Sequence, residues 1–253
     1  MAVYTRINES DLSLIEKNFS IGKIVSFSGI KKGIENTNYL IKTNKKKIIL
    51  TIFEKRVQKK DLPFFMNLMF GLSKNKIKCP EPIKDKKGRY LFKIKNKTAC
   101  LVSFLEGKDK NQLTNKDCFQ VGKNAALLHL AAKKLRLYRK NSLSVNSWGP
   151  LLNRIDKRIN KLSSNLIDTM RTDLVDIKKK WPKSMPNGII HSDLFIDNIF
   201  FYKKKYYGFI DFYFSANDFL AYELATCVNA LCFKKRNKIF ILDKTKSSQL
   251  LKG

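Results

Sequence analysis

The sequence predicts an α+β fold with two lobes, a small antiparallel β-rich lobe over residues 1–105 and a larger, mostly helical lobe over residues 106–253. In the first part, short apolar runs alternate with turn residues, which is typical of antiparallel strands. From Thr114 onward, apolar residues recur at helical spacing. A polar hairpin at residues 188–213 interrupts this helical part. We expect the second lobe to carry the chemistry of the protein on that hairpin.

The composition is strongly basic. The 253 residues suffice for one large or two modest domains, and their formal net charge is +30. Such a charge ordinarily suggests a nucleic acid or an anionic membrane as partner. The lysines, however, are spread through nearly every segment, as on a solvated surface. We expect no specific nucleic-acid partner and no membrane, although this surface would attract a phosphate-rich nucleotide.

Cysteine and histidine usage indicates neither a disulfide framework nor a zinc site. The five cysteines form no Cys-x-x-Cys motif, and their number is odd. Only two histidines, His129 and His191, are present. Residues 1–16 lack the apolar core of a signal peptide, and no apolar run approaches the roughly 20 residues that span a bilayer. We expect a reduced, cytoplasmic protein.

The first elements are a helix and a strand hairpin. Apolar residues at helical spacing predict a helix over residues 9–18 with Ser10 as its N-cap. Residues 22–28 and 39–43 are expected to be antiparallel strands, joined by a turn over residues 29–38.

That turn is a candidate phosphate-binding loop. It contains Gly29 and Gly33, and the backbone N–H groups of a glycine-containing turn can point at phosphates. Asn36 and Asn38, near its end, are further candidate nucleotide contacts. Gly-x-x-x-Gly alone is a weak signal, since most such turns only reverse the chain.

A third strand is expected over residues 47–54, where a protein kinase carries a phosphate-positioning lysine. Thr51 stands at that place, and the nearest basic residues are Lys55 and Arg56. Either Lys55 reaches back to the phosphates, or a basic contact is absent. Arg56 could equally bind an acceptor carboxylate, because guanidinium groups pair with carboxylates. A solvated strand end is the third possibility.

The remaining elements follow in order. Asp61 as N-cap and Pro63 in the first turn predict a helix, two strands are expected over residues 90–94 and 98–104, and residues 105–107 leave the sheet. A helix starts at Thr114, and His129 within its apolar face is expected to be a hydrogen-bonded core residue. A long helical region is predicted over residues 148–180.

The hairpin supplies the candidate chemistry. Its strands are expected over residues 198–202 and 207–212, with Asp193 in the loop before them, Asn198 at the start of the first and Asp211 at the end of the second. Phosphoryl transfer needs one carboxylate to orient the attacking hydroxyl, and an amide oxygen with a second carboxylate to hold Mg²⁺. The alternative is a structural hairpin whose Asp and Asn side chains cap turns. Three groups in the kinase order and spacing favour catalysis.

The sequence resembles the small-molecule kinases typified by aminoglycoside phosphotransferases and choline kinase, and within them it is most similar to the homoserine kinases of bacterial threonine synthesis. The residues that carry this closer resemblance are Met1-Ala-Val-Tyr-Thr5, Gly33-Ile-Glu-Asn-Thr-Asn38, Leu50-Thr-Ile-Phe-Glu-Lys-Arg56, Asp61-Leu-Pro-Phe-Phe65, Cys79-Pro-Glu-Pro82, His191-Ser-Asp-Leu-Phe195, and Ile210-Asp-Phe-Tyr-Phe214 running into Asp218 and Ala221-Tyr-Glu-Leu224.

The resemblance implies a protein-kinase-like fold that binds ATP and Mg²⁺ between its lobes and phosphorylates the side-chain hydroxyl of L-homoserine. Asp193 would orient or accept the hydroxyl proton, His191 would brace the loop, and Asn198 with Asp211 would bind Mg²⁺. The adenine edge would meet the exit from the small lobe, which makes Ser103 and Leu105 candidate nucleotide contacts.

The acceptor side is implied to lie along a helix that starts at Asp218. Asp218 and Glu223 are candidates to receive a substrate ammonium, and Asp218 could instead only cap the helix. The family continues with further helices beyond the point where this chain stops, so part of the acceptor-side wall is expected to be absent.

Two alternatives stay open. The first keeps the fold and changes the acceptor to choline, an aminoglycoside, hydroxylysine or methylthioribose; aromatic residues near Asp218 would suit choline. Those aromatic residues are Phe212, Tyr213, Phe214 and Tyr222. The second is a non-catalytic, basic nucleic-acid binder on a kinase-like shell, which would show steep salt dependence. The intact set of Asp193, Asn198 and Asp211 argues against it.

Overall fold

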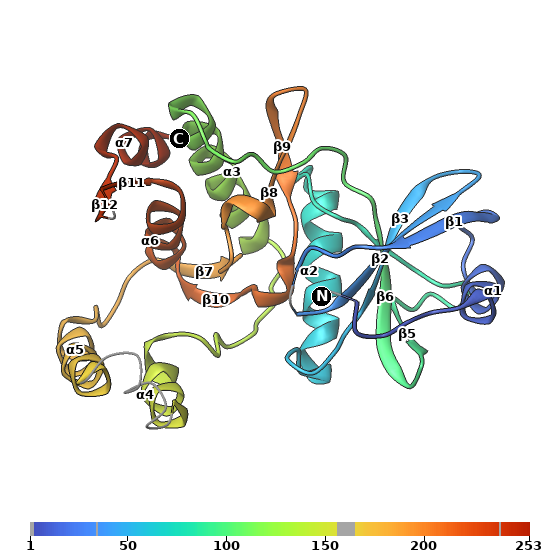
Figure 1. Cartoon of the computed structure of the whole chain (residues 1–253), viewed down its shortest axis with the longest axis horizontal. Helices are drawn as coiled ribbons and strands as arrows, with labels where there is room; N and C mark the ends of the chain where they lie inside the picture. The colour runs from blue at the N-terminus through green and yellow to red at the C-terminus, as the bar shows by residue number, and fades with distance from the viewer. Residues whose placement is uncertain (1–2, 34, 156–164, 238) are drawn as a thin grey trace.

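An antiparallel sheet forms the first part of the molecule (Figure 1). The structure is a computed structural model that describes residues 3–33, 35–155, 165–237 and 239–253. In the sheet the strand order is β1-β2-β3-β6-β4, and β5 pairs with β6. The strands are β1 (Ile24–Gly29), β2 (Thr37–Thr43), β3 (Lys47–Ile52), β4 (Pro82–Ile83), β5 (Leu91–Ile94) and β6 (Lys97–Ser103). All six precede residue 105, as the α+β prediction requires.

One face of the sheet is covered by helix α1 (Glu9–Asn18), whose bounds are those predicted. Its side chains Leu12 and Ile15 join Ile41, Ile48 and other strand residues in one apolar cluster. The predicted N-cap Ser10 is wrong. Asn8 is the cap, because its side chain accepts the N–H of Asp11 while Asp11 accepts the N–H of Asn8, a reciprocal capping box.

The other face is covered by helix α2 (Leu62–Lys74), with Phe65 and Leu68 fully buried. This core is continuous with that of the helical lobe, so the two lobes share one apolar cluster. Asp61 stands at the predicted N-cap position but caps nothing. Its carboxylate instead accepts a hydrogen bond from Arg139 Nε at 2.7 Å, which ties the helix start to the second lobe.

The second lobe is mostly helical, with small two-stranded sheets between the helices. Thr114 caps α3 through a capping box with Asp117. The helices are α3 (Asn115–Lys133), α4 (Val145–Arg154), α5 (Leu166–Lys180), α6 (Leu220–Leu231) and α7 (Lys244–Lys252). The sheets pair β7 (Asn187–Ile190) with β10 (Ala216–Phe219), β8 (Ile199–Tyr202) with β9 (Lys205–Phe209), and β11 (Phe233–Arg236) with β12 (Ile239–Leu242).

Two predicted helices differ from the structure. The helical region predicted over residues 148–180 includes α5 and most of α4. Helix α4 begins earlier, at Val145, and contains Pro150. Residues 156–164 lie outside the described residues. The last predicted helix was expected to begin at Asp218. Asp218 instead lies in β10 opposite Gly188, and α6 begins two residues later at Leu220.

The β8–β9 hairpin is fixed between two other segments by close backbone contacts. Lys108, just after the exit from the sheet, exchanges two backbone hydrogen bonds with Phe201 of β8. Gly107 lies so close to this strand that a Cβ would come within 2.6 Å of the Phe201 carbonyl oxygen. Gly208 of β9 approaches the Lys78 carbonyl in the same way, at 2.4 Å. The inter-lobe connection therefore positions the hairpin that carries the polar residues.

In the described part of the chain, no helix is both long and apolar enough to cross a membrane. All five cysteines are free and buried.

Helix α7 lies against α3 at backbone distance. A Cβ on Gly122 of α3 would come within 1.9 Å of the Leu250 carbonyl oxygen, and Leu250 itself is buried.

Gly122→Ala should therefore force α7 away from α3 and lower the midpoint of thermal unfolding. Loss of a close contact and a strained repacking cost on the order of 1–3 kcal/mol, which corresponds to several degrees for a chain of this size. Ala126→Gly on the same helix lacks this steric cause and is the control for helix propensity. An unchanged midpoint for Gly122→Ala would contradict this packing of α7.

Candidate active site

Two residues in the left-handed region of backbone conformation shape the ends of the site. Ser192 has φ of +69° and turns the chain after β7 so that Asp193 leaves the β7–β10 sheet. Asp211 has φ of +62° and lies two residues beyond Phe209, where β9 ends, so the strand predicted over residues 207–212 ends before it. Asp and Asn tolerate this conformation better than most residues.

Asp193 and Asn198 form one hydrogen-bonded unit. Nδ2 of Asn198 donates to the Asp193 carboxylate Oδ2 at 2.8 Å and to the Asp193 carbonyl oxygen at 2.8 Å. The backbone N–H of Ile210 donates to the Asn198 carbonyl at 3.0 Å, so the residue beside Asp211 is tied to the same unit. The predicted polar residues are thus brought together.

His191 lies beneath this unit and is fully buried. Its Nε2 lies 2.9 Å from the Ile210 carbonyl oxygen, and its Nδ1 accepts the N–H of Asp193 at 3.3 Å. Burial lowers the pKa of the imidazole, despite the nearby charge of Glu223. A neutral ring with its proton on Nε2 satisfies both contacts. This geometry suits the predicted brace and leaves no nitrogen for an acceptor.

Glu223 does not occupy the acceptor position that the sequence suggested. It is fully buried, and its Oε2 and Oε1 accept the backbone N–H groups of His191 at 2.6 Å and Ser192 at 2.8 Å. His129 Nε2 lies 3.3 Å from the same carboxylate, which makes His129 the hydrogen-bonded core residue that was expected. A carboxylate with these partners and no exposure cannot receive a substrate, so Glu223 holds the loop in place.

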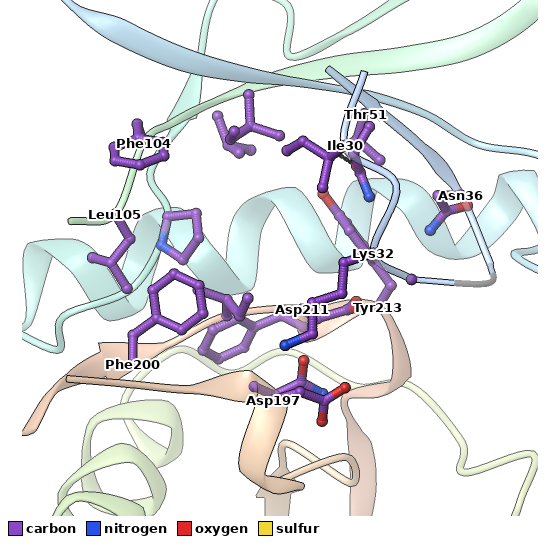
Figure 2. A pocket seen from close by; sticks show the side chains of 18 of the residues that line it. Ile30, Lys32, Asn36, Thr51, Phe104, Leu105, Asp197, Phe200, Asp211 and Tyr213 are labelled. Carbon is purple, nitrogen blue, oxygen red and sulfur yellow. Dashed lines mark hydrogen bonds between the residues drawn. The ribbon is translucent and has the colours of Figure 1, made fainter. Parts of the chain in front are cut away.

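A cavity of about 260 Å³ lies between the sheet and the hairpin (Figure 2). Phe104, Leu105 and Phe200 stand at one end of it, and Lys32 and Asp211 stand toward the other. The first end suits a flat aromatic base and the second suits charged groups. The remaining lining residues are Ile30, Gly33, Glu35, Asn36, Asn38, Ile49, Thr51, Met69, Pro80, Val102, Ser103, Asp109, Asp197, Asn198, Ile210, Phe212 and Tyr213.

The carboxylates at the charged end and that of Asp193, which does not line the cavity but contacts Asn198, repel one another. Burial raises the pKa of Asp193 to about 7, and the charges of Asp211, Asp197 and Glu35 add to the rise while the Asn198 hydrogen bond opposes it. Burial likewise raises the pKa of Asp211 to about 6, with Glu35 and Asp197 adding to it. Carboxylates that repel one another in a buried site favour binding of a cation.

The donor set suits a hard divalent cation shared with a phosphate-bearing ligand. Asp211 offers a half-buried carboxylate at the cavity wall, and Asn198 offers its amide oxygen because its amide N–H groups donate to Asp193. In the described residues, no group of three or more His, Cys, Asp or Glu side chains could by itself enclose a metal. Mg²⁺ commonly takes one or two protein ligands and completes its shell with phosphate oxygens and water.

The two glycines of the predicted turn lie in different surroundings. Gly33, with φ of +100°, lines the cavity together with Asn36 and Asn38. Gly29 does not line it; a Cβ there would meet the Val3 side chain at 2.7 Å, so this glycine admits the N-terminal segment.

Thr51 occupies the position in β3 where a protein kinase carries its phosphate-positioning lysine, as the sequence indicated. Thr51 of β3 lines the cavity and its hydroxyl donates to Asn38 Oδ1 at 2.8 Å. Lys55 is exposed and lies outside the cavity wall. Among the described residues that line the cavity, Lys32 is the one basic side chain, and it pairs with Asp109 at 2.5 Å.

The remaining acceptor candidates, Arg56 and Asp218, do not line the cavity themselves. Arg56 forms an ion pair with Glu35, a cavity residue. Asp218 accepts hydrogen bonds from Asn141 Nδ2 at 2.7 Å and from the backbone N–H of Phe219 at 2.8 Å. Its carboxylate therefore braces the β10 region, and neither of its oxygens lines the cavity.

Sequence reasoning missed several cavity residues. Lys32 and Glu35 stand inside the predicted turn, but nothing in the local pattern distinguishes them from solvated charges. Asp197 was visible only as a second acidic residue beside Asn198. For the apolar end, Phe104 follows β6 directly and could have been found as the residue beside the predicted exit.

Comparisons with known proteins found relatives over the whole chain. A model of the phosphotransferase enzyme family matches residues 26–240. The whole chain is 41% identical to a homoserine kinase of Brucella anthropi, 77% of which it covers, and 43% identical to one of Allorhizobium ampelinum, 78% of which it covers.

Solved structures of similar fold are more distant in sequence. An amicoumacin kinase in complex with AMP-PNP, Ca²⁺ and Ami has a TM-score of 0.68 at 17% identity, over 97% of this chain and 77% of that one. A choline kinase of Cryptosporidium parvum has a TM-score of 0.66 at 16% identity, over 94% and 74%. These likenesses confirm the protein-kinase-like fold that the sequence predicted.

Glu223→Gln should weaken both the loop and the reaction. The amide keeps the shape of the side chain but removes the negative charge that accepts two backbone N–H groups. This loss should lower the free energy of unfolding by about 2 kcal/mol. Misplacing the loop by a fraction of an ångström should lower kcat about 10- to 100-fold, with the KM for nucleotide nearly unchanged. The measurements are steady-state kinetics and thermal unfolding.

The matched control is Asp176→Asn, which neutralises an exposed carboxylate on α5. Wild-type kcat in Glu223→Gln would remove this residue from its role in holding the loop.

Asp211→Asn should abolish turnover. In the absence of metal and nucleotide, however, it should raise the thermal stability of the protein. A folded-state pKa of about 6, above the usual 3.8, means that ionised Asp211 disfavours the folded state. This penalty is absent below pH 4, grows between pH 4 and 6, and is complete above pH 6. The unfolding midpoint in EDTA should rise by about 2–4 °C at pH 8 and by much less at pH 4.5. A lower midpoint at pH 8 would contradict the penalty.

Proposed function

The chain belongs to the phosphotransferase enzyme family, and we propose that it is a homoserine kinase, which transfers the γ-phosphoryl group of ATP to the side-chain hydroxyl of L-homoserine. The observation that carries this proposal is the identity of 41–43% with homoserine kinases over all 253 residues. The catalytic loop and hairpin supply the groups that such a transfer needs.

Asp193 is the proposed group that orients the acceptor hydroxyl and takes its proton. Its Oδ2 is held by Asn198 at 2.8 Å, which leaves the second carboxylate oxygen to face the acceptor. A pKa of about 7 places this carboxyl near the range in which a general base works best at neutral pH. His191 and Glu223 act only through the backbone of the loop.

Asn198 and Asp211 are the proposed ligands of Mg²⁺. When bound, the ion would neutralise charge on the transferred phosphoryl group. Its positive charge would also stabilise the ionised forms of Asp193 and Asp211, whose pKa values are raised in the protein alone.

The nucleotide is proposed to lie in the cavity with its base against Phe104, Leu105 and Phe200. Val102 and Ile49 of the sheet complete this apolar end. We assign the basic phosphate contact to Lys32 of the turn in place of the exposed Lys55, because Lys32 lines the cavity.

Choline was an alternative acceptor because of the aromatic residues near Asp218, but two of these side chains are not arranged to bind it. Phe212 is fully buried with its ring 4.5 Å from that of His191. Phe214 lies under the guanidinium of Arg56, whose Cζ is 5.1 Å from the ring centre. A cage for a quaternary ammonium needs free aromatic faces, and these two rings do not offer them.

Two organisational proposals accompany the function. We place the boundary between the nucleotide-binding lobe and the catalytic lobe at residues 105/106, where the chain leaves the sheet. The five buried free thiols suit a reducing compartment, so we propose the cytoplasm as the place of action.

The proposal predicts Mg²⁺-dependent ADP release from ATP with L-homoserine, and little release with choline, hydroxylysine or kanamycin. Asp193→Asn should lower kcat about 10²–10⁴-fold while nucleotide binding, measured by calorimetry, stays nearly intact. Turnover with another acceptor in the panel and none with homoserine would contradict the proposed substrate. Near-normal turnover by Asp193→Asn would contradict the assigned base.

A further inference from the structure

We propose that the Glu35–Arg56 ion pair is the subsite that recognises the α-amino and α-carboxylate groups of the acceptor, with Glu35 binding the ammonium and Arg56 the carboxylate. This inference rests on the proposed function, and it names the residues that would make the enzyme select a free amino acid over other alcohols.

The pair lies at the edge of the cavity, where Glu35 lines the cavity and Arg56 does not. Glu35 follows the glycine-containing turn and lines the cavity, and Arg56 follows β3 and forms the ion pair with it. The Arg56 guanidinium lies over the ring of Phe214, three residues beyond Asp211. The pair thus joins the small lobe to the end of the hairpin that carries the proposed metal ligand.

Both partners keep unused hydrogen-bonding capacity. Glu35 Oε1 accepts from Arg56 Nη1, while Glu35 Oε2 is buried and has no hydrogen-bond partner among the described residues. A buried carboxylate oxygen without a partner is costly unless a ligand supplies a donor. Arg56 has four further N–H donors and its side chain is 57% exposed, so a carboxylate can reach it.

The charges match a zwitterion. An ammonium placed beside Glu35 and a carboxylate placed beside Arg56 complete an alternating arrangement of four charges, in which every group has neighbours of opposite sign. Only two methylene groups separate the hydroxyl oxygen of homoserine from its α-carbon. The subsite must therefore lie close to Asp193, and the charge of Glu35 is felt by both Asp193 and Asp211.

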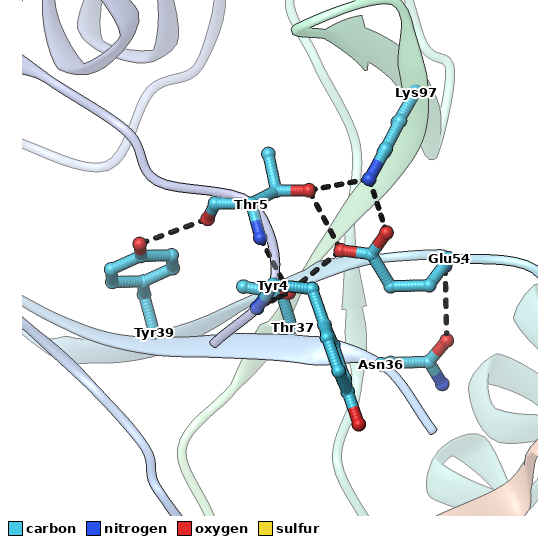
Figure 3. A network of polar contacts seen from close by, with 7 residues as sticks. All are labelled: Tyr4, Thr5, Asn36, Thr37, Tyr39, Glu54 and Lys97. Atoms are coloured by element: carbon cyan, nitrogen blue, oxygen red, sulfur yellow. Dashed lines mark hydrogen bonds and ion pairs between the residues drawn. The ribbon is translucent and has the colours of Figure 1, made fainter. Parts of the chain in front are cut away.

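The segment that carries Glu35 is anchored by a polar network (Figure 3). Asn36 accepts the backbone N–H of Glu54 at 3.4 Å, and the Thr37 hydroxyl donates to the Glu54 carboxylate at 2.7 Å. Lys97 forms an ion pair with the same carboxylate. Asn36 and Thr37, the two residues after Glu35, are thereby tied to Glu54, which lies two residues beyond β3 and two before Arg56, so both members of the pair are positioned before a ligand binds.

A nucleotide is the less suitable ligand for Glu35. A carboxylate beside the triphosphate would repel it, and Asp197 and Asp211 already add negative charge at that end of the cavity. An ammonium relieves this repulsion. The pair is therefore assigned to the acceptor and not to ATP.

The test uses two acceptors that each lack one charged group of homoserine. 4-Hydroxybutanoate lacks the ammonium and 3-aminopropan-1-ol lacks the carboxylate. Glu35→Gln should lower kcat/KM for L-homoserine by about 10- to 100-fold and change that for 4-hydroxybutanoate less than about threefold. Arg56→Gln should show the converse, a loss with homoserine and little change with 3-aminopropan-1-ol.

The matched controls are Glu9→Gln and Lys59→Gln, which remove exposed charges outside the cavity. The KM for ATP should stay within about twofold of the wild-type value in both test variants. Thermal unfolding checks that each variant is folded. Should Glu35→Gln fail to fold, the acceptor preference of Arg56→Gln carries the test.

The outcomes separate the two proposals. If the wild type does not phosphorylate L-homoserine, the proposed function fails. If the wild type does so but the variants lose equal activity with intact and truncated acceptors, or lose ATP affinity instead, the function stands and the subsite is overturned.

Discussion

The site depends on one buried carboxylate. Glu223 has no exposed surface, and its oxygens accept two successive backbone N–H groups of the loop that carries Asp193. A charge this deep is tolerated only when its hydrogen bonds are complete, so helix α6 and the loop stabilise each other. The loop can then hold Ser192 at positive φ and direct Asp193 toward Asn198. Because α6 packs against β7, the large lobe determines where Asp193, the proposed general base, lies.

The distribution of charge is the reverse of what the composition suggests. The chain carries a formal surplus of +30, yet the charged end of the cavity is acidic, and of the described residues lining it only Lys32 is basic. Surface lysines stay hydrated and screened, whereas the partly buried carboxylates of Glu35, Asp193 and Asp211 are screened less and interact more strongly. The ligands must therefore bring positive charge into the site. A metal ion at Asp211 and an ammonium at Glu35 would each do so, which links nucleotide and acceptor binding through the same electrostatic need.

Local patterns predicted the elements better than their ends. Helix α1 was predicted at its observed bounds, but its cap is Asn8, one position before the helix, because that side chain reaches the N–H of Asp11. The hairpin was predicted from its two short apolar strands, but Asp211, expected at the close of the second strand, lies just past it in the left-handed region. Asp is a residue type that often caps helices, but Asp218 lies in a strand, because strand pairing opposite Gly188 outweighs this local preference for a helix cap.

The sequence by itself determined the fold class and identified Asp193, Asn198 and Asp211 as the proposed residues of the reaction centre, because they lie in and next to one hairpin and are close together along the chain. The tertiary structure decided which other residues join them. Glu223 is 32 residues from His191, and Arg56 is 21 from Glu35. Contacts at such separations leave no local signal, because they depend on how α6 packs on β7 and how the turn folds over β3. Because Glu223 is fully buried, it braces the loop and does not bind the substrate. The spacing of residues along the chain does not show which of them are buried.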